Sequence, residues 1–145
     1  MRTAVRLLCV FMNKCLTLIL VILLISCSKV GEAPERTFDH SKEFVDLSIE
    51  IRGNWKQVCI ITPYSNNQSA EDLIGFKFDI ETKSKIHTLD GITLLVATDG
   101  NKVFEYFEVP RDNLDFSSLK SSCYSKDDSK FKIINRNGWN GVQHI

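Results

Sequence analysis

The sequence predicts an all-β fold, a small antiparallel β-sandwich or barrel of five or six strands, over residues 44–145. Two patterns favour this class. Val45–Ile51 alternates apolar and polar residues, which is the period of a half-buried strand. Asp99-Gly100 lies between two β-rich runs, which is the strongest short signal for a hairpin. No long helical pattern appears, and about a hundred residues make one small domain, so we expect a single β domain.

The first two expected strands are Val45–Ile51 and Trp55–Ile61. Arg52-Gly53-Asn54 separates them with residues typical of turns. The second run ends in continuous apolar residues, which is typical of a central strand, and Pro63 stops it. Two strands around a Gly-Asn turn predict a hairpin.

The third expected strand is Ile74–Ile80, in which apolar residues alternate with polar residues and glycine. The segment before it, residues 62–73, reads as a polar loop. We expect at most one helical turn there, over Ser69–Asp72, with Ser69 as its cap.

Ile92–Thr98 and Val103–Val109 are expected to form the Asp99-Gly100 hairpin. A loop of two residues would pair Val96 with Val103, whereas a loop of three residues would exchange the faces. The sequence therefore leaves open whether Phe104 and Tyr106 are buried or exposed.

The last part of the chain predicts less regular structure. Pro110 ends the hairpin, and Asp112–Leu119 is expected to form a short helical turn with Asp112 as its cap. One more strand is expected over Lys130–Ile134, followed by a polar, aromatic tail over residues 135–145.

The N-terminus has the pattern of an export signal over residues 1–26. Leu16–Ser26 is apolar but shorter than the roughly 20 residues that a membrane-spanning helix needs. Lys14 precedes it, and residues 1–26 hold no Asp or Glu, as in a secretory signal peptide. Met12 would also begin a complete short signal, so Met1 and Met12 are both candidate starts.

The end of this signal resembles the lipobox of bacterial lipoproteins. Leu24-Ile25-Ser26-Cys27 has an aliphatic residue, a tolerant position and a small residue before the cysteine. The resemblance implies that Cys27 is lipidated and becomes the first residue of the mature protein, and two or more acyl chains anchor a protein stably. Ser28 in place of aspartate implies the periplasmic side of the outer membrane rather than the inner membrane.

Residues 27–43 are expected to be the lipidated cysteine and a flexible tether, because Ser28–Glu43 is polar and without a clear period. The whole chain is formally neutral, and removal of Arg2, Arg6 and Lys14 with the signal leaves a net charge of −3. A mildly acidic chain offers neither the basic surface that binds nucleic acid nor a polybasic patch that binds lipid headgroups.

The five cysteines divide by position. Cys9 and Cys15 lie in the signal and Cys27 is the lipid site, which leaves Cys59 and Cys123 as a pair. In an oxidising periplasm such a pair predicts a disulfide. The alternative is a buried free thiol at Cys59 and an unpaired Cys123 in a charged loop.

The residues point to binding rather than catalysis. No nucleophile motif, phosphate cradle or spaced set of metal ligands is present, so we expect no enzyme activity, no metal and no cofactor. Glu105 and Glu108 are interpreted as solvated surface. Aromatic residues are good interface anchors, and the candidates for binding a protein partner are Tyr64, Phe104, Tyr106 and Trp139.

The order of these features is similar to that of type VI secretion immunity periplasmic lipoproteins. Those proteins have a lipobox, a short tether, a Gly-Asn turn comparable to Gly53-Asn54, and a Val-Cys strand that ends in proline, as Val58–Pro63 does here. The resemblance covers residues 16–63, and this chain departs from it in the insert Trp55-Lys56-Gln57. It implies a stoichiometric binder of a toxin effector. The alternatives are a lysozyme inhibitor and a structural or assembly lipoprotein of the envelope.

Overall fold

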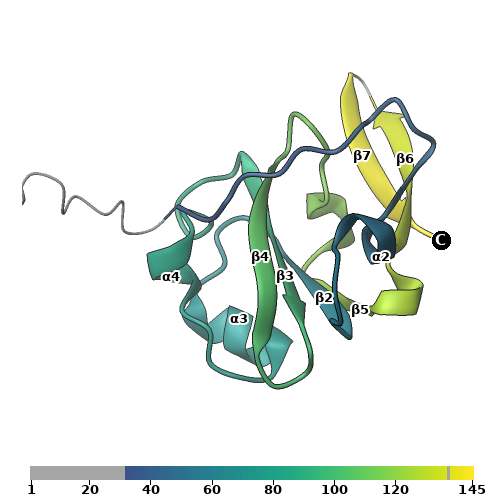
Figure 1. Ribbon diagram of the computed structural model, residues 1–145. Helices are drawn as coiled ribbons and strands as arrows, with labels where there is room; N and C mark the ends of the chain where they lie inside the picture. The colour runs from purple at the N-terminus through teal and green to yellow at the C-terminus, as the bar shows by residue number, and fades with distance from the viewer. Residues whose placement is uncertain (1–31, 137) are drawn as a thin grey trace, which may run out of the picture. The chain divides into compact units, whose positions relative to one another are not determined.

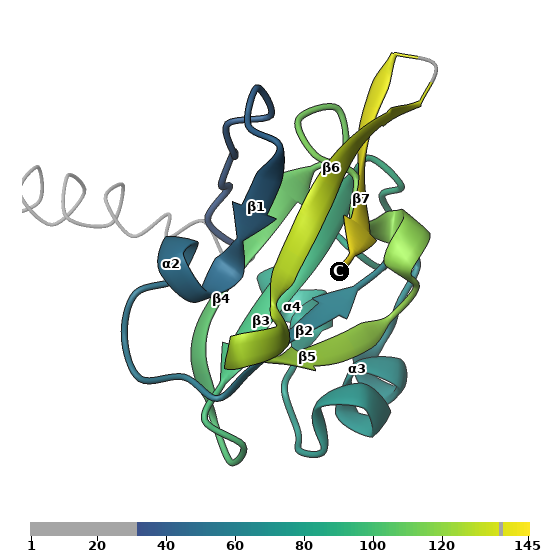
Figure 2. The same ribbon diagram turned by 90° about the vertical axis from the view of Figure 1, so that its right-hand side faces the viewer.

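Two antiparallel sheets form the domain in the computed structural model, which describes residues 32–136 and 138–145 (Figure 1). Within these residues the larger sheet has the strand order β4-β3-β2-β5 and the smaller sheet has the order β1-β6-β7. The predicted all-β class is confirmed, and the arrangement is sandwich-like. Figure 2 shows the smaller sheet from its side of the domain, with β6 between β1 and β7.

The elements follow one another along the chain with short connections. The strands are β1 (Phe44–Asp46), β2 (Gln57–Ile61), β3 (Ile92–Thr98), β4 (Val103–Pro110), β5 (Ser122–Ser125), β6 (Lys130–Arg136) and β7 (Trp139–His144). The helices are α2 (Leu47–Glu50), α3 (Asn67–Ile74), α4 (Ile80–Lys83), η1 (Ser117–Leu119) and η2 (Lys126–Asp128).

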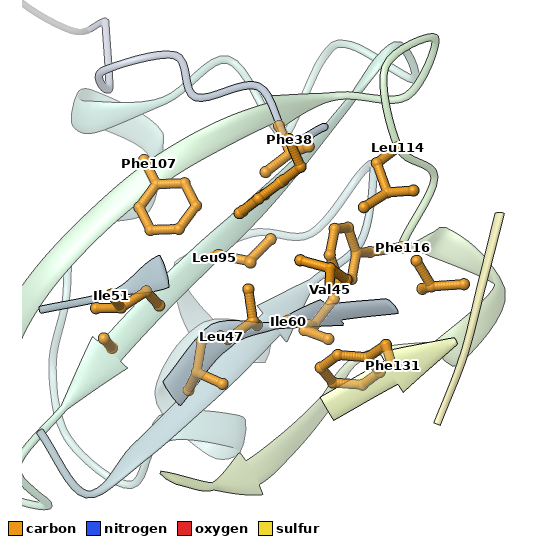
Figure 3. Close-up of a cluster of buried hydrophobic side chains, with 14 of the residues drawn as sticks. Phe38, Val45, Leu47, Ile51, Ile60, Leu95, Phe107, Leu114, Phe116 and Phe131 are labelled. Atoms are coloured by element: carbon orange, nitrogen blue, oxygen red, sulfur yellow. The ribbon is translucent and has the colours of Figure 1, made fainter. Parts of the chain in front are cut away.

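One hydrophobic core fills the space between the two sheets (Figure 3). Val45 and Phe131 enter it from the smaller sheet, and Ile60, Leu95 and Phe107 enter it from the larger sheet. Phe131 lies edge-on to Phe116, with ring centroids 5.7 Å apart, which is a favourable aromatic geometry. Burial of these side chains holds the two sheets together.

A second core covers the other face of the larger sheet. Cys59, Ile61 and Val96 point to this face, where they meet buried residues of α3 and α4, among them Ala70 and Ile80. Strands β2 and β3 are therefore buried on both faces, which explains why their sequences are continuously apolar instead of alternating.

The Asp99-Gly100 hairpin is confirmed, but its register matches neither expected loop. Thr98 pairs with Val103, and the Asp99 amide donates to the Lys102 carbonyl, which makes a loop of four residues. Because Ala97 pairs with Glu105, Phe104 is the extra residue of a β-bulge. Phe104 is exposed, whereas Tyr106 is half-buried.

The predicted strand Val45–Ile51 was wrong beyond Asp46, and so was its hairpin with Trp55–Ile61. The Asp46 carboxylate accepts a hydrogen bond from the Ser48 amide at 3.0 Å and caps α2, so the chain turns instead of extending. Leu47 and Ile51 are fully buried while Ile49 is 73% exposed, which fits one helical turn and not a strand. Strand β1 pairs with β6 in the other sheet.

The predicted strand Ile74–Ile80 was also wrong, because two helices occupy its ends. Ile74 is the last residue of α3, and Gly75 ends that helix in the left-handed region at φ 91°. Asp79 then caps α4, which begins at Ile80. Helix α3 is longer than the single expected turn, and Asn66 rather than Ser69 is its N-cap.

The C-terminal part holds two strands that the sequence analysis missed. Cys123 lies in β5 beside β2 instead of in a charged loop. The expected tail forms β7, which pairs with β6 along its length. The expected helical turn is confined to η1, which has no side-chain cap, so Asp112 does not cap it.

Residues 32–38, which we name the N-terminal strap, pack onto the domain. Ala33 and Phe38 are each only 6% exposed. The Arg36 amide donates to the Glu108 carbonyl, and the Glu108 amide donates to the Pro34 carbonyl, both at 2.8 Å. Residues 32–38 of the predicted flexible tether therefore contact the β domain. The signal peptide, Cys27 and residues 28–31 lie outside the described residues.

Two acidic residues expected to be solvated make contacts within the domain, and one of them, Glu105, holds the strap. Glu105 forms an ion pair with Arg36, whose guanidinium also lies 4.0 Å from the centroid of the Phe107 ring. The Glu108 carboxylate accepts a hydrogen bond from the Ser84 hydroxyl at 2.6 Å. Glu105 and Glu108 of β4 therefore bind the strap and the residue that follows α4, respectively.

Candidate functional site

An open hollow lies where β4 ends, beside the first residue of β7. It has a volume of about 380 Å³ and is lined by Asp90, Gly91, Pro110, Arg111, Asp112 and Trp139. The Trp139 side chain is 54% exposed, so a large flat apolar surface borders the hollow without being buried in the core. Three separate parts of the chain meet here: the loop before β3, the turn after β4, and β7. We call this hollow the tryptophan hollow.

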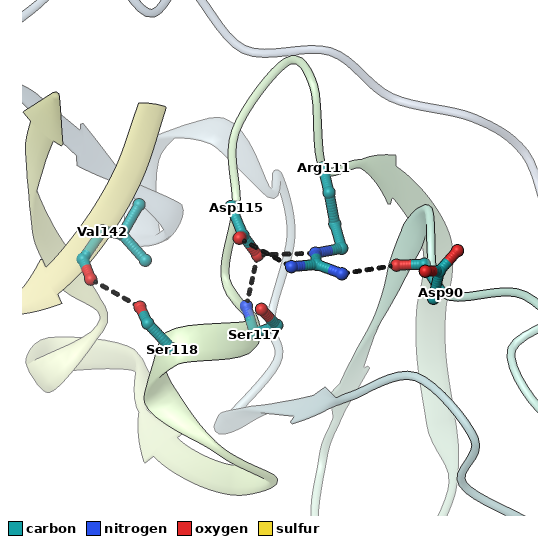
Figure 4. A network of polar contacts seen from close by, with 6 residues as sticks. All are labelled: Asp90, Arg111, Asp115, Ser117, Ser118 and Val142. Atoms are coloured by element: carbon teal, nitrogen blue, oxygen red, sulfur yellow. Dashed lines mark hydrogen bonds and ion pairs between the residues drawn. The ribbon is translucent and has the colours of Figure 1, made fainter. Parts of the chain in front are cut away.

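Arg111, which lines the hollow, is held by hydrogen bonds to Asp115 and Asp90 (Figure 4). Its Nε donates to Oδ1 of Asp115 at 3.0 Å, and its Nη2 donates to Oδ2 at 3.1 Å. Its Nη1 donates to the carbonyl oxygen of Asp90 at 2.7 Å. This two-point ion pair fixes the guanidinium plane, so the hollow has a defined shape before any partner arrives.

The same contacts lower the pKa of Asp115 and raise the pKa of Arg111, so both shifts favour the charged forms. Burial alone would raise the pKa of Asp115, but the hydrogen bonds from Arg111 and from Ser117 outweigh it and hold that pKa below its ordinary value. The Asp115 carboxylate raises the pKa of Arg111. Both groups are therefore charged at neutral pH.

The segment after Arg111 also fixes β7. The Asp115 amide donates to the Asn140 carbonyl at 2.7 Å, and the Ser118 hydroxyl donates to the Val142 carbonyl at 3.1 Å. Figure 4 shows this second contact beside the arginine network. The strand that begins at Trp139 is thereby held against the segment that carries Arg111.

A second hollow of about 400 Å³ adjoins the first, because Pro110 and Asp112 line both. Its other lining residues are Glu35 and Thr37 of the N-terminal strap, and Asn113. The Phe38 amide donates to Oδ1 of Asn113 at 2.7 Å, and Nδ2 of Asn113 donates to the Phe38 carbonyl at 2.9 Å. The strap is thus part of the same surface.

Two of the four predicted binding residues lie at this end of the sheets. Trp139 lines the hollow, and Tyr64, which is 67% exposed, follows the end of β2, which lies beside the start of β3. Tyr64 adopts a positive φ of 64° and its amide donates to the Ile86 carbonyl at 2.8 Å. The strained backbone of this residue is therefore fixed by the loop that leads to Asp90.

The other two predicted binding residues lie elsewhere. Phe104 covers Gly53, where an added Cβ would come 2.2 Å from the ring, so it is partly engaged within the domain. Tyr106 packs edge-on against Phe78, with ring centroids 5.3 Å apart, over the second core. The structure thus does not bring Phe104 and Tyr106 together with Trp139.

The disulfide expected from the leftover cysteines is present. Cys59 of β2 and Cys123 of β5 lie directly opposite each other in the antiparallel pair and are bonded. The bond joins segments 64 residues apart in the chain and ties the edge strand β5 to the centre of the larger sheet.

Sequence reasoning missed the polar half of the site. Asp90 carried no signal of its own, and Asp112 was interpreted only as a helix cap. Arg111 and Asp115 are four residues apart, which is the spacing of an ion pair across one helical turn. That spacing was the one signal available from the sequence.

Comparisons with protein-family models, with curated proteins and with solved structures give no match to this chain. In the part of the chain that the structure describes, no three His, Cys, Asp or Glu side chains gather as metal ligands would. None of the described helices is long and apolar enough to cross a membrane.

Proposed function

We propose that this protein is a lipid-anchored binding protein of the periplasm, which neutralises a secreted toxin by stoichiometric binding. The observation that carries the proposal is the exposure of Trp139 and Tyr64 at the end of the domain where the tryptophan hollow lies. Aromatic side chains of this kind supply much of the energy of protein interfaces, because they bury a large rigid area on binding.

The fixed structure around the tryptophan hollow supports a role in binding. The ion pair between Arg111 and Asp115 and the bonds to β7 fix the surroundings of Trp139. A surface that is ordered before binding loses less conformational entropy when the partner arrives. A stoichiometric inhibitor needs high affinity, and such preorganisation favours high affinity in one small domain.

The proposed compartment is supported by two independent features. The resemblance of Leu24–Cys27 to a lipobox implies lipidation and export, and Ser28 implies the outer membrane. The bond between Cys59 and Cys123 is of the kind that persists in an oxidising compartment such as the periplasm. The domain would then meet the toxin in the space where the toxin acts.

The test is survival under attack. A strain lacking the gene is challenged with isogenic toxin-delivering cells and complemented with the wild-type gene or with a Trp139→Ala, Tyr64→Ala double variant. We expect the deletion to lower survival and the double variant to restore it less well than wild type. Ile49→Ala is the matched control, since Ile49 is an exposed apolar residue of α2.

Unchanged survival of the deletion strain would argue against immunity. A deletion strain that resists the attackers but lyses in added lysozyme would favour the lysozyme-inhibitor alternative. An adjacent gene for a toxin or a secretion component would agree with the immunity proposal.

A further inference from the structure

The tryptophan hollow carries two carboxylates that form no ion pair among the described residues. Arg111 is already neutralised by Asp115, and its Nε, Nη1 and Nη2 all donate within the domain. Asp90 and Asp112 are exposed and line the hollow. Among residues 32–136 and 138–145, the carboxylates of Asp90 and Asp112 accept no hydrogen bond and form no ion pair, although the charge of Asp90 acts on Arg111 through space.

We propose that this hollow receives an arginine side chain from a surface loop of the protein partner, an inference that rests on the proposed function. The indole of Trp139 offers a face on which a planar guanidinium can stack. The carboxylates of Asp90 and Asp112 offer acceptors for its N–H groups, and a guanidinium binds a carboxylate through two parallel hydrogen bonds. The more compact ammonium of lysine makes neither the stacked nor the two-point contact as well.

The adjoining hollow, which is lined in part by the N-terminal strap, adds another carboxylate to this surface. The exposed residue Glu35 lines this adjoining hollow, which shares Asp112 with the tryptophan hollow. Acidic residues that line two adjoining hollows raise the association rate of a basic surface by electrostatic steering. The partner surface that fits is therefore a basic loop with one inserted arginine.

The two tryptophans of the chain allow a direct measurement of this contact. Trp55 is 2% exposed and its indole N–H donates to the Ile51 carbonyl at 2.8 Å, whereas Trp139 is exposed at the hollow. The full chain is purified in detergent with ¹⁵N-labelled tryptophan, and the indole resonances are followed by NMR. The probe is the capped tripeptide acetyl-Gly-Arg-Gly-amide, and the control peptide carries citrulline, the neutral analogue of arginine.

The arginine peptide is expected to shift the Trp139 resonance saturably and to bind at least fivefold more tightly than the citrulline peptide. Asp90→Asn and Asp112→Asn are each expected to weaken its binding about two- to fivefold, the range of exposed ion pairs. Asp127→Asn, at an exposed carboxylate in η2, is the matched control and should leave binding unchanged. An unmoved Trp55 resonance shows that each variant is folded.

Equal binding of the two peptides, or unchanged binding in the Asp90→Asn, Asp112→Asn double variant, would overturn the inference. The survival assay separates it from the proposed function. A double variant that protects cells fully would overturn the arginine contact and leave immunity standing. An arginine-selective shift together with normal survival of the deletion strain would support the contact and refute immunity.

Discussion

Arg111 and Asp115 form a two-point ion pair whose side chains are only 28% and 16% exposed. Because the folded protein depresses the pKa of Asp115, the stabilisation is present above the ordinary carboxyl value of 3.8 and is lost as the pH falls through the folded value. We expect Asp115→Asn to lower the free energy of unfolding by about 1–2 kcal/mol at pH 7, since the pair is partly screened by solvent. Urea unfolding at a series of pH values measures this difference.

The gap between wild type and Asp115→Asn should close at the acid end of that series, where the wild-type carboxyl is itself protonated. Asp127→Asn, which removes an exposed carboxylate of η2, serves as the control. A difference that is constant down to pH 2 would show that charge on Asp115 is not the cause.

The disulfide provides a second stability prediction. Cys59 and Cys123 close a loop with a sequence separation of 64, and by loop-closure entropy the bond stabilises by roughly 4 kcal/mol. We expect the Cys59→Ala, Cys123→Ala double variant to unfold at a markedly lower denaturant concentration than the oxidised protein. Comparison with reduced wild type separates the bond from the loss of the buried sulfur at Cys59. Equal midpoints for oxidised and reduced wild type would contradict the prediction.

The sequence was sufficient to predict the hairpin of β3 and β4, strand β2 and the disulfide, because each has a single clear signal in the sequence. Asp99-Gly100 indicated the hairpin of β3 and β4, although the turn is a loop of four residues in which Gly100 has a φ of 102°. Strand β2 was identified from its continuous apolar residues, and burial on both faces is the reason for them. The disulfide was predicted from the positions of the cysteines in the chain and from the expected oxidising compartment.

The sequence failed where a local cap competed with an alternating pattern. Asp46 turns the chain into α2, and Asp79 does the same for α4, although both segments alternate as strands do. Of the candidate site, Tyr64 and Trp139 were identified by their chemistry. The hollow itself was not predictable, because Trp139 lies in the smaller sheet and is brought to Asp90 and Arg111 by contacts between distant segments, such as the bond from the Asp115 amide to the Asn140 carbonyl.

The strap gives a prediction that separates a packed segment from a flexible tether. Phe38 is 6% exposed and its ring lies 6.1 Å from that of Phe116 and 6.3 Å from that of Phe107, measured between centroids. We expect Phe38→Ala to cost about 3–5 kcal/mol of unfolding free energy, as for other buried aromatic residues. The neighbouring exposed residue Thr37 is the control, and Thr37→Ala should leave the unfolding midpoint nearly unchanged. Equal effects of the two substitutions would indicate a flexible segment at these positions.

The proposed lipid anchor gives a prediction about processing. Replacing Cys27 by alanine removes the thiol that would be acylated, so we expect no labelling with radioactive palmitate and no cleavage by the lipoprotein signal peptidase. The variant should migrate as the longer precursor, and it should separate from the outer membrane on fractionation. Cys15→Ala is the matched control, because Cys15 lies in the predicted signal peptide away from the lipobox. Normal labelling and cleavage of the Cys27→Ala protein would refute the anchor, since stable attachment by acyl chains depends on that single cysteine.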